Sequence, residues 1–324
     1  MSHKTKFNYI IFHRGCLDGF SAYFVAHNSG RLTKDIKIYP DIPSTHKIPP
    51  NINGKDILIA DVAYKKEVLE EIFKVAKSVV FIDHHISIKE DVDILHKKYN
   101  NKGNITIIYD DTRCGATLTW KYFNGREKIP LFLKYVEDQD TGTWMYPNTK
   151  PFIYALKTYY HLSTERKSIN KWFRLLKKDN VEKMIKRGKR MAKFMTHLVN
   201  TALPKYTLLR FPSQNIYNKN PNLFNKVGKY KVAVYCGLNC PSTTDLAIAV
   251  FKYIECDFCL MWTYNIDRKT YIVSMRSKQV DVGKICKLFG GGGHKLAAGC
   301  AFNASEYKID DLFHGRALPK MLKK

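Results

Sequence analysis

Short apolar runs alternate with segments of helical periodicity in the N-terminal half of the chain. Runs typical of buried strands occupy residues 7–13, 56–60, 79–82 and 104–111, and a segment with helical periodicity lies at 65–77. Alternation of this kind requires right-handed crossovers and a mainly parallel sheet covered by helices on both faces. The sequence therefore predicts an α/β domain.

Side chains that can bind metal or move protons follow the ends of these predicted strands. The first strand is followed by His13 and Asp18, the second by Asp61, and the third by Asp83, His84 and His85. Taken alone, an Asp at a strand end is usually a turn residue or a helix cap. In open α/β sheets, however, ligands bind at the carboxyl ends of the strands, so several such residues favour one shared site.

Carboxylates combined with neutral imidazoles are typical ligands of hydrolytic metal centres. Two divalent cations ~3.5–4 Å apart can hold the attacking and leaving oxygens of a phosphoryl group, which requires at least one bridging carboxylate. Such a ligand set suits Mn²⁺, and Mg²⁺ less well. The segment EDQDTGTW adds Asp138 and Asp140 as rival candidates for a further carboxylate ligand.

Five motifs in the chain resemble those of the DHH family of phosphoesterases. The four catalytic motifs are matched in order by FHRGCLDGFSA, LIADVAY, FIDHHIS and EDQDTGTW. GGGGHKLAAG, preceded by VSMRS, resembles the glycine-rich motif of the C-terminal domain found in many members. The resemblance spans about residues 7–305. Within the family, the chain is similar to oligoribonuclease-like (nanoRNase-like) phosphodiesterases.

The resemblance implies a centre of two manganese ions. Asp61 would bridge the ions, and His13 would help to hold one of them. The other site would be completed by Asp18, His84 and Asp140, because Asp140 matches the family pattern better than Asp138 does.

The resemblance also implies roles for two other residues of the DHH tripeptide, and the chain departs from the family pattern at one position near this centre. His85 would face the scissile phosphate, and Asp83 would orient His84. Cys16 stands where many members have an aspartate. Either its thiolate is a ligand and tunes the His13 site toward zinc or iron, or that site is weaker. The two ions are therefore expected to be Mn²⁺, with Mg²⁺, Co²⁺, Zn²⁺ and Fe²⁺ as alternatives.

The glycine-rich motif is interpreted as a substrate-binding element. Glycines that open a helix allow backbone N–H groups to approach an anion closely, and the alternative is a flexible turn. Arg276 and His294 would add side-chain donors to a phosphate or a base. The predicted substrate-binding residues are Arg276, Gly291, Gly292, Gly293 and His294.

The charge of the chain favours a polyanionic partner. The formal net charge is +25, and residues 161–210 hold 14 Lys or Arg against 3 Asp or Glu. A solvated helical face is the alternative interpretation of that segment. We predict a DHH catalytic domain at 1–150, a basic helical connector at 151–225 and a smaller α/β substrate-binding domain at 226–324.

Nothing in the sequence points to secretion or to a membrane. Eight cysteines are scattered singly, and no apolar stretch approaches the ~18 residues of a membrane span. The N-terminus reads as a first strand rather than a signal peptide. We therefore expect a cytoplasmic protein without a membrane partner, and the sequence leaves a homo-oligomer open.

The function predicted from these features is metal-dependent phosphoester hydrolysis. The resemblance implies attack of a metal-bound hydroxide on phosphorus in short RNA or DNA oligonucleotides, dinucleotides or related nucleotide phosphates. One alternative is an inorganic pyrophosphatase or polyphosphatase, which shares the catalytic domain. The other is a non-catalytic nucleic-acid-binding protein, which the high positive charge would also allow.

Overall fold

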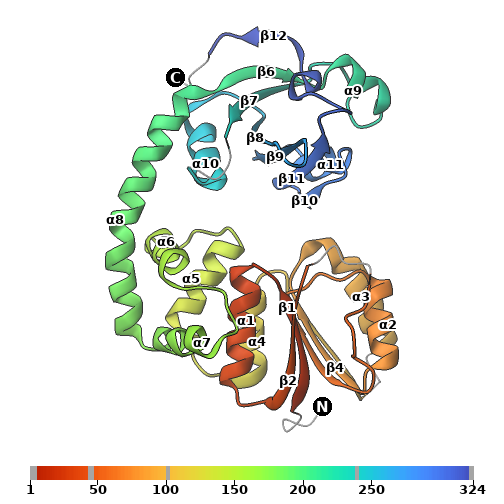
Figure 1. Ribbon diagram of the computed structural model, residues 1–324, viewed down its shortest axis with the longest axis vertical. Helices are drawn as coiled ribbons and strands as arrows, with labels where there is room; N and C mark the ends of the chain where they lie inside the picture. The colour runs from red at the N-terminus through yellow and green to blue at the C-terminus, as the bar shows by residue number, and fades with distance from the viewer. Residues whose placement is uncertain (1–5, 43–46, 100–102, 238–240, 321–324) are drawn as a thin grey trace. The chain divides into compact units, whose positions relative to one another are not determined.

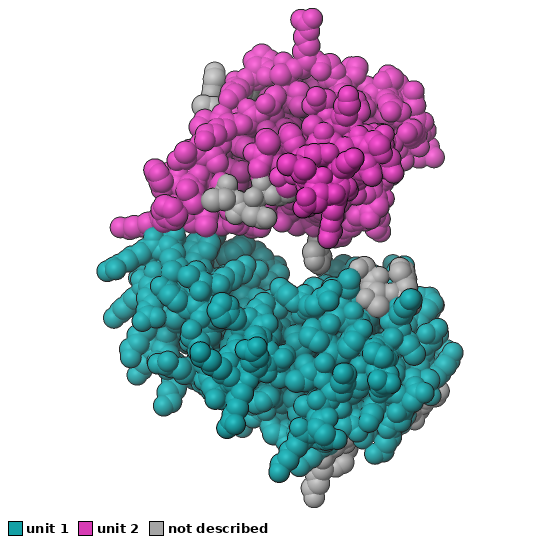
Figure 2. All heavy atoms as spheres, in the orientation of Figure 1, with its two compact units in different colours: residues 1–192 teal, residues 193–324 magenta. Residues whose placement is uncertain are grey.

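The chain folds into two compact units. The computed structural model describes residues 6–42, 47–99, 103–237 and 241–320. Residues 1–192 form the first unit and residues 193–324 the second (Figures 1 and 2). The division into 1–150, 151–225 and 226–324 stays a prediction.

A five-stranded parallel sheet forms the centre of the first unit, in the order β2-β1-β3-β4-β5. Its strands are β1 (Phe7–His13), β2 (Leu32–Asp41), β3 (Asp56–Ala60), β4 (Ser78–Asp83) and β5 (Ile105–Tyr109). The order shows that the chain first moves from β1 to one side of the sheet and then to the other. The switch point between β1 and β3 is where open α/β sheets bind ligands. The predicted α/β class is confirmed.

Helices cover both faces of this sheet (Figure 1). On β1, Ile10 packs with the core that includes α1 and α4, whereas Ile11 packs with the core that includes α2 and α3. This alternation follows from the two-residue period of a strand. The helices of the unit are α1 (Leu17–Asn28), α2 (Lys66–Val75), α3 (Lys89–Tyr99), α4 (Gly115–Asn124), α5 (Leu131–Asp140), α6 (Thr149–Tyr159) and α7 (Arg166–Trp172).

Strand β2 was missed by the sequence analysis. It is an edge strand that pairs only with β1 among the described residues. Its apolar residues Ile36 and Ile38 are half-buried, and lysines and an aspartate lie between and beside them. Edge strands bury less surface than central ones, so the apolar signal from which strands were predicted is weak here.

Helix α8 (Lys178–Ala202) is a single helix of 25 residues. In its first half Val181, Met184 and Ile185 are buried in the core of the first unit. A Cβ on Gly188 would lie 1.7 Å from the carbonyl oxygen of Pro151, so only glycine allows α8 to approach the start of α6 this closely. The predicted helical character of this segment is confirmed, and its lysines and arginines are largely exposed.

The second unit is built on a seven-stranded mixed sheet in the order β10-β11-β9-β8-β7-β6-β12. Only β7 and β8 pair in parallel, and α10 connects them. The strands are β6 (Thr207–Phe211), β7 (Tyr230–Cys236), β8 (Phe258–Asn265), β9 (Thr270–Ser277), β10 (Gly292–His294), β11 (Ala297–Asn303) and β12 (His314–Leu318). The helices are α9 (Gln214–Lys219), α10 (Thr243–Tyr253) and α11 (Val282–Lys287).

The glycine stretch differs from the prediction. It follows α11 and enters β10, which pairs with β11 as an antiparallel hairpin, instead of opening a helix. Before it in the chain, β8 and β9 pair as an antiparallel hairpin. Within the described part of the chain, no helix combines the length and apolarity that crossing a membrane requires.

Candidate metal centre

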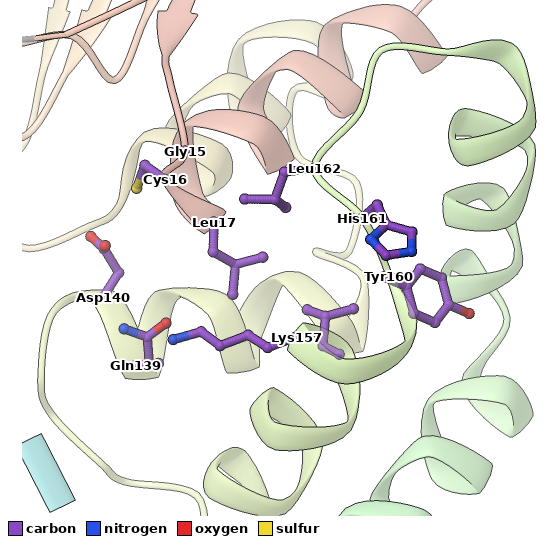
Figure 3. A pocket seen from close by; sticks show the side chains of 10 residues that line it. Gly15, Cys16, Leu17, Gln139, Asp140, Lys157, Tyr160, His161 and Leu162 are labelled. Carbon is purple, nitrogen blue, oxygen red and sulfur yellow. The ribbon is translucent and has the colours of Figure 1, made fainter. Parts of the chain in front are cut away.

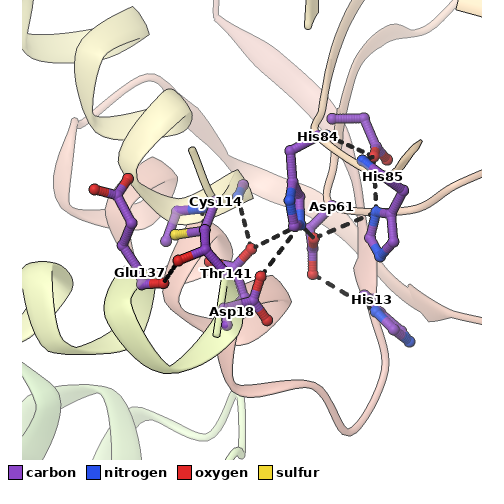
Figure 4. Close-up of polar contacts among 12 residues, drawn as sticks. His13, Asp18, Asp61, His84, His85, Cys114, Glu137 and Thr141 are labelled. Atoms are coloured by element: carbon purple, nitrogen blue, oxygen red, sulfur yellow. Dashed lines mark hydrogen bonds and ion pairs between the residues drawn. The ribbon is translucent and has the colours of Figure 1, made fainter. Parts of the chain in front are cut away.

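The predicted acidic and histidine residues gather at the carboxyl edge of the parallel sheet. His13 ends β1, Asp61 directly follows β3, and His84 directly follows β4. Two helix termini complete the group, because Cys16 precedes α1 and Asp140 ends α5, and the two lie near each other (Figure 3). The chain thus brings side chains from separate elements to the switch point of the sheet (Figure 4).

Asp61 lies between two histidines. Its Oδ1 is 3.2 Å from Nε2 of His84, and its Oδ2 is 3.6 Å from Nδ1 of His13. The residue has a φ of 63°, a left-handed conformation that Asp tolerates better than most residues. Its backbone N–H donates to the carbonyl oxygen of Ile82 at 2.9 Å, which ties this turn to β4. A carboxylate with one oxygen toward each histidine has the geometry of a bridging ligand.

Three carboxylates converge on Nε2 of His84. The distances are 3.2 Å to Asp61 Oδ1, 3.4 Å to Asp140 Oδ2 and 3.6 Å to Asp18 Oδ2. Burial lowers the pKa of His84, but the hydrogen bond to Asp61 and the charges of Asp18 and Asp140 outweigh it and raise the pKa to about 10. The cluster therefore attracts positive charge strongly at the position of this ring nitrogen.

Asp18 is fixed by the amino end of α4. Its Oδ2 accepts a hydrogen bond from the backbone N–H of Gly115 at 2.6 Å, and its Oδ1 accepts one from Ala116 at 2.9 Å. Asp18 is fully buried, and burial together with the charges of Asp61 and Asp140 raises its pKa well above the usual range. The hydrogen bonds hold the carboxylate in place although its neighbours repel it.

Gly115 is a site residue that the sequence analysis missed. A Cβ at this position would lie 2.7 Å from Cβ of Asp61 and 3.0 Å from Oδ2 of Asp18. Only glycine therefore lets α4 approach the two carboxylates. The available signal was the glycine of CGATLTW, which follows the fourth predicted strand and occupies the first position of α4.

Asp83 contacts the ring of His85 and not that of His84. Its Oδ1 accepts hydrogen bonds from Nδ1 of His85 at 2.7 Å and from the backbone N–H groups of His84 and His85 at 2.7 and 2.8 Å. The sequence analysis expected Asp83 to orient the ring of His84. An ionised carboxylate only accepts hydrogen bonds, so Nδ1 of His85 carries the proton. Burial lowers the pKa of His85, but the hydrogen bond to Asp83 and the charges of Asp83 and Asp61 together raise it by more.

The donor set fits two cations that share Asp61. The ligand atoms of Asp18, Asp61 and His84 lie within 4.8 Å of one another, and those of His13, Asp61 and His85 do so as well. Nδ1 of His13 and Oδ2 of Asp61 are buried without a hydrogen-bond partner in the described part of the chain. Buried polar atoms are costly to leave unpaired, and bound cations would satisfy these two.

Cys16 lies at the border of this centre. Burial and the charges of Asp61, Asp18 and Asp140 raise the pKa of its thiol well above the usual range, so the group is protonated in the metal-free protein. Its sulfur belongs to neither of the two groups of ligand atoms among the described residues. Its proposed role as a ligand therefore stays a prediction.

Asp140 and its rival Asp138 have different surroundings. Asp140 faces His84, and burial and the charge of Asp61 raise its pKa to about 6. Asp138 is buried and accepts hydrogen bonds from the Thr143 hydroxyl at 2.7 Å, from the backbone N–H groups of Met145 and Tyr146 at 2.6 and 3.1 Å, and from the Thr149 hydroxyl. Asp138 thus holds the segment between α5 and α6.

The predicted substrate-binding residues lie in the second unit. Nη1 of Arg276, on β9, donates to the Ser274 hydroxyl at 2.8 Å and to the Met275 carbonyl at 2.9 Å, and Nη2 donates to the Thr243 hydroxyl at 3.3 Å. The side chain of His294 lies outside the described residues. The part these residues play in substrate binding stays a prediction.

The glycines of the β10–β11 hairpin have a packing role. A Cβ on Gly291 would lie 2.2 Å from the carbonyl oxygen of Gly299, and one on Gly293 would lie 2.7 Å from that of Ala297. A Cβ on Gly292 would have no described atom within 4 Å. Gly292 is therefore the member of the motif at which packing alone does not require glycine.

Comparisons with known proteins agree with this architecture. Residues 258–314 match the DHHA1 domain family. An uncharacterized protein of Acanthamoeba polyphaga mimivirus is 26% identical over 332 residues, which cover 95% of this chain and 72% of that protein. The solved structure of PggH, a pGpG-specific phosphodiesterase from Vibrio cholerae, has a TM-score of 0.50 at 13% identity and covers 92% of this chain and 94% of that chain. The likeness to that structure concerns the fold.

Proposed function

We propose that the chain is a DHH-family phosphoester hydrolase that cleaves phosphodiester bonds in short oligonucleotides or dinucleotides at the cluster around Asp61. The match of residues 258–314 to the DHHA1 domain family supports this proposal. The observation that carries the proposal is the convergence of three carboxylates on Nε2 of His84, with the second oxygen of Asp61 directed at His13. This arrangement is costly without cations and favourable with them.

The proposed ligands divide into two sets. Asp18, Asp61, His84 and Asp140 would hold one divalent cation, and Asp61 and His13 would hold the other, with Cys16 as the proposed additional ligand. Hard carboxylates with some imidazole favour Mn²⁺ over softer cations. When bound, the two cations would activate water and stabilise negative charge on the phosphoryl group.

His85 is the proposed catalytic residue of the chain itself. Asp83 accepts the hydrogen bond from its Nδ1 and raises its pKa, which favours the protonated form of the ring. A protonated imidazole next to the centre can donate a hydrogen bond to a phosphoryl oxygen or a proton to the leaving oxygen. Asp83 positions this ring and holds its charge without contacting the substrate.

Binding of the rest of the substrate is assigned to Arg276, Gly291, Gly292, Gly293 and His294. Arg276 offers guanidinium donors, and Gly292 offers a backbone without a side chain in the way. The basic face of α8 would attract polyanions over several ångströms, an effect that salt weakens. We also propose a cytoplasmic location, from the scattered cysteines.

The test uses metal-stripped protein resupplied with Mn²⁺. Its substrates are a 5′-labelled RNA dinucleotide, a 24-mer, a cyclic dinucleotide and pyrophosphate. Release of mononucleotide from the dinucleotide by the wild type, lost in Asp61→Asn, is the expected result. The matched control is Asp93→Asn, which removes an exposed carboxylate from α3.

Two other outcomes would overturn the proposal. Phosphate release from pyrophosphate alone would favour the pyrophosphatase alternative. The absence of turnover with Mn²⁺, Mg²⁺, Co²⁺ and Zn²⁺, together with salt-sensitive binding of RNA, would favour a non-catalytic nucleic-acid-binding protein.

A further inference from the structure

A pocket of about 390 Å³ adjoins the candidate metal centre within the first unit. Cys16 and Asp140 line the end next to the carboxylates, and residues of α6 and of the segment after it line the remainder (Figure 3). The volume falls in the ~300–1,000 Å³ range of small-molecule sites. A substrate whose phosphate lies at the centre can therefore extend into this pocket.

The polar side chains in the pocket are free to bind a ligand. Lys157, Gln139 and His161 line it, and none of the three side chains forms a hydrogen bond or an ion pair with a described residue. Figure 3 shows the Lys157 side chain reaching toward Gln139, near the Asp140 end, with His161 on the other side of Leu162. A lysine beside an acidic cluster would ordinarily form an ion pair with it, yet the nitrogen of Lys157 is not within ion-pair distance of Asp140.

The remaining walls suit the body of a nucleoside. Leu17 and Leu156 are buried residues that present apolar surface, and the exposed ring of His161 offers a flat face. Bases stack on aromatic rings, and leucines accommodate a ribose or base edge. The pocket thus combines the Lys157 cation, the Gln139 amide, the imidazole ring of His161 and apolar surface, which matches the chemistry of a nucleotide.

We propose that this pocket binds the nucleotide next to the scissile phosphate, and that Lys157 pairs with a second phosphate carried by that nucleotide. The inference rests on the proposed phosphodiesterase function and adds to it the residue that recognises a terminal phosphate of the substrate. Lys157 is then a specificity-determining residue, because a substrate without the second phosphate gains nothing from it.

The test compares kcat/KM for three dinucleotides, pApA, ApAp and ApA, with wild type, Lys157→Gln and Lys157→Arg. A charge-assisted hydrogen bond to phosphate is worth about tenfold in kcat/KM or more. We expect the wild type to prefer one phosphorylated dinucleotide over ApA by about that factor. Lys157→Gln should lose the preference for the phosphorylated dinucleotide, and Lys157→Arg should retain most of it. The control is Lys167→Gln, which removes an equal charge from an exposed position on α7 outside the pocket.

A binding measurement separates this inference from the proposed function. Isothermal titration calorimetry with phosphorothioate-linked pApA, ApAp and ApA reports the phosphate preference whether or not turnover occurs. A wild-type preference that Lys157→Gln retains would overturn the assignment, as would a wild type that does not distinguish the three probes. Failure of turnover together with a Lys157-dependent binding preference would overturn the proposed activity and leave the pocket assignment standing.

Discussion

Oδ1 of Asp83 lies 2.7 Å from Nδ1 of His85, and both residues belong to the DHH tripeptide. The same oxygen also accepts the backbone N–H groups of His84 and His85, so one buried atom fixes the start of the segment after β4. The carboxylate thereby controls both the orientation and the charge of His85 without reaching the carboxylate cluster itself.

Replacing Asp83 by asparagine should lower kcat and shift its pH dependence. We expect a loss of ~10–100-fold, the usual effect of removing a partner that orients a metal-site residue. Because Asp83 raises the pKa of His85, its neutralisation should lower that pKa, and the activity that depends on protonated His85 should be lost at a lower pH than in the wild type. A pH–kcat profile checks this, and a falling limb at unchanged pH would contradict it.

Replacing Asp61, the carboxylate common to both groups of ligand atoms, should release more bound metal than replacing Asp140. We expect Asp61→Asn to lose both Mn²⁺ ions, because Asp61 belongs to both groups of ligand atoms, and Asp140→Asn to lose one. Bound metal stabilises the folded state by mass action, about 2.7 kcal/mol at a hundredfold excess over Kd. Elemental analysis and the Mn²⁺-dependent rise in Tm measure both effects. Equal loss of Mn²⁺ from the two variants would argue that Asp61 is not a ligand common to both ions.

Gly115→Ala should disrupt the centre although it removes no ligand. The added Cβ would lie 2.7 Å from Cβ of Asp61, so α4 or the strand end must move. Overpacking of this kind costs about 1–3 kcal/mol. We expect a lower Tm and weaker Mn²⁺ binding, with Gly103→Ala as the control because its Cβ would meet no described atom within 4 Å. Unchanged Mn²⁺ affinity would contradict the proposed role of this close approach.

Asp138→Ala should destabilise the first unit at neutral pH and less so in acid. Burial raises the pKa of Asp138, but hydrogen bonds from Thr149, Thr143, Met145 and Tyr146 outweigh it and lower the pKa. A carboxyl group whose pKa is lower in the folded state than in the unfolded state stabilises the protein at pH values above the unfolded-state pKa of ~3.9. This stabilisation is lost as the pH falls through the folded-state pKa.

We expect this variant to lose about 1–3 kcal/mol at pH 7, and the difference from the wild type to shrink in acid below pH ~3.9. Urea unfolding at several pH values measures it, with Asp93→Ala as the exposed control. A difference that does not depend on pH would show that the charge of Asp138 contributes little.

Two neighbouring glycines of the hairpin should respond differently to alanine. Gly291→Ala would place a Cβ 2.2 Å from the carbonyl oxygen of Gly299, so we expect a lower Tm for the second unit. Gly292→Ala has open space and should leave the Tm unchanged, while the methyl group should weaken substrate binding. Calorimetry and KM distinguish the two effects. Normal KM in Gly292→Ala would remove this residue from the proposed substrate contacts.

The sequence by itself determined the parallel α/β architecture of the first unit and the edge at which its functional residues gather. Strand and helix periodicity are local signals, and parallel strands place their carboxyl ends at one edge. His13, Asp61 and His84 could therefore be assigned to one cluster before any contact was known. The edge strand β2 gave too weak a local signal, because its apolar residues are only half-buried and charged residues lie among them.

Tertiary structure alone decided how the side chains in the cluster pair. Asp18 meets the backbone of Gly115 across 97 residues of sequence, a contact that exists only because α1 packs against α4. Whether Asp83 contacts the ring of His84 or that of His85 depends on the backbone dihedrals after β4, which the order of the residues does not specify. The residue types and their strand ends are thus encoded locally, whereas distances of a few ångströms between them arise from the packing of whole elements.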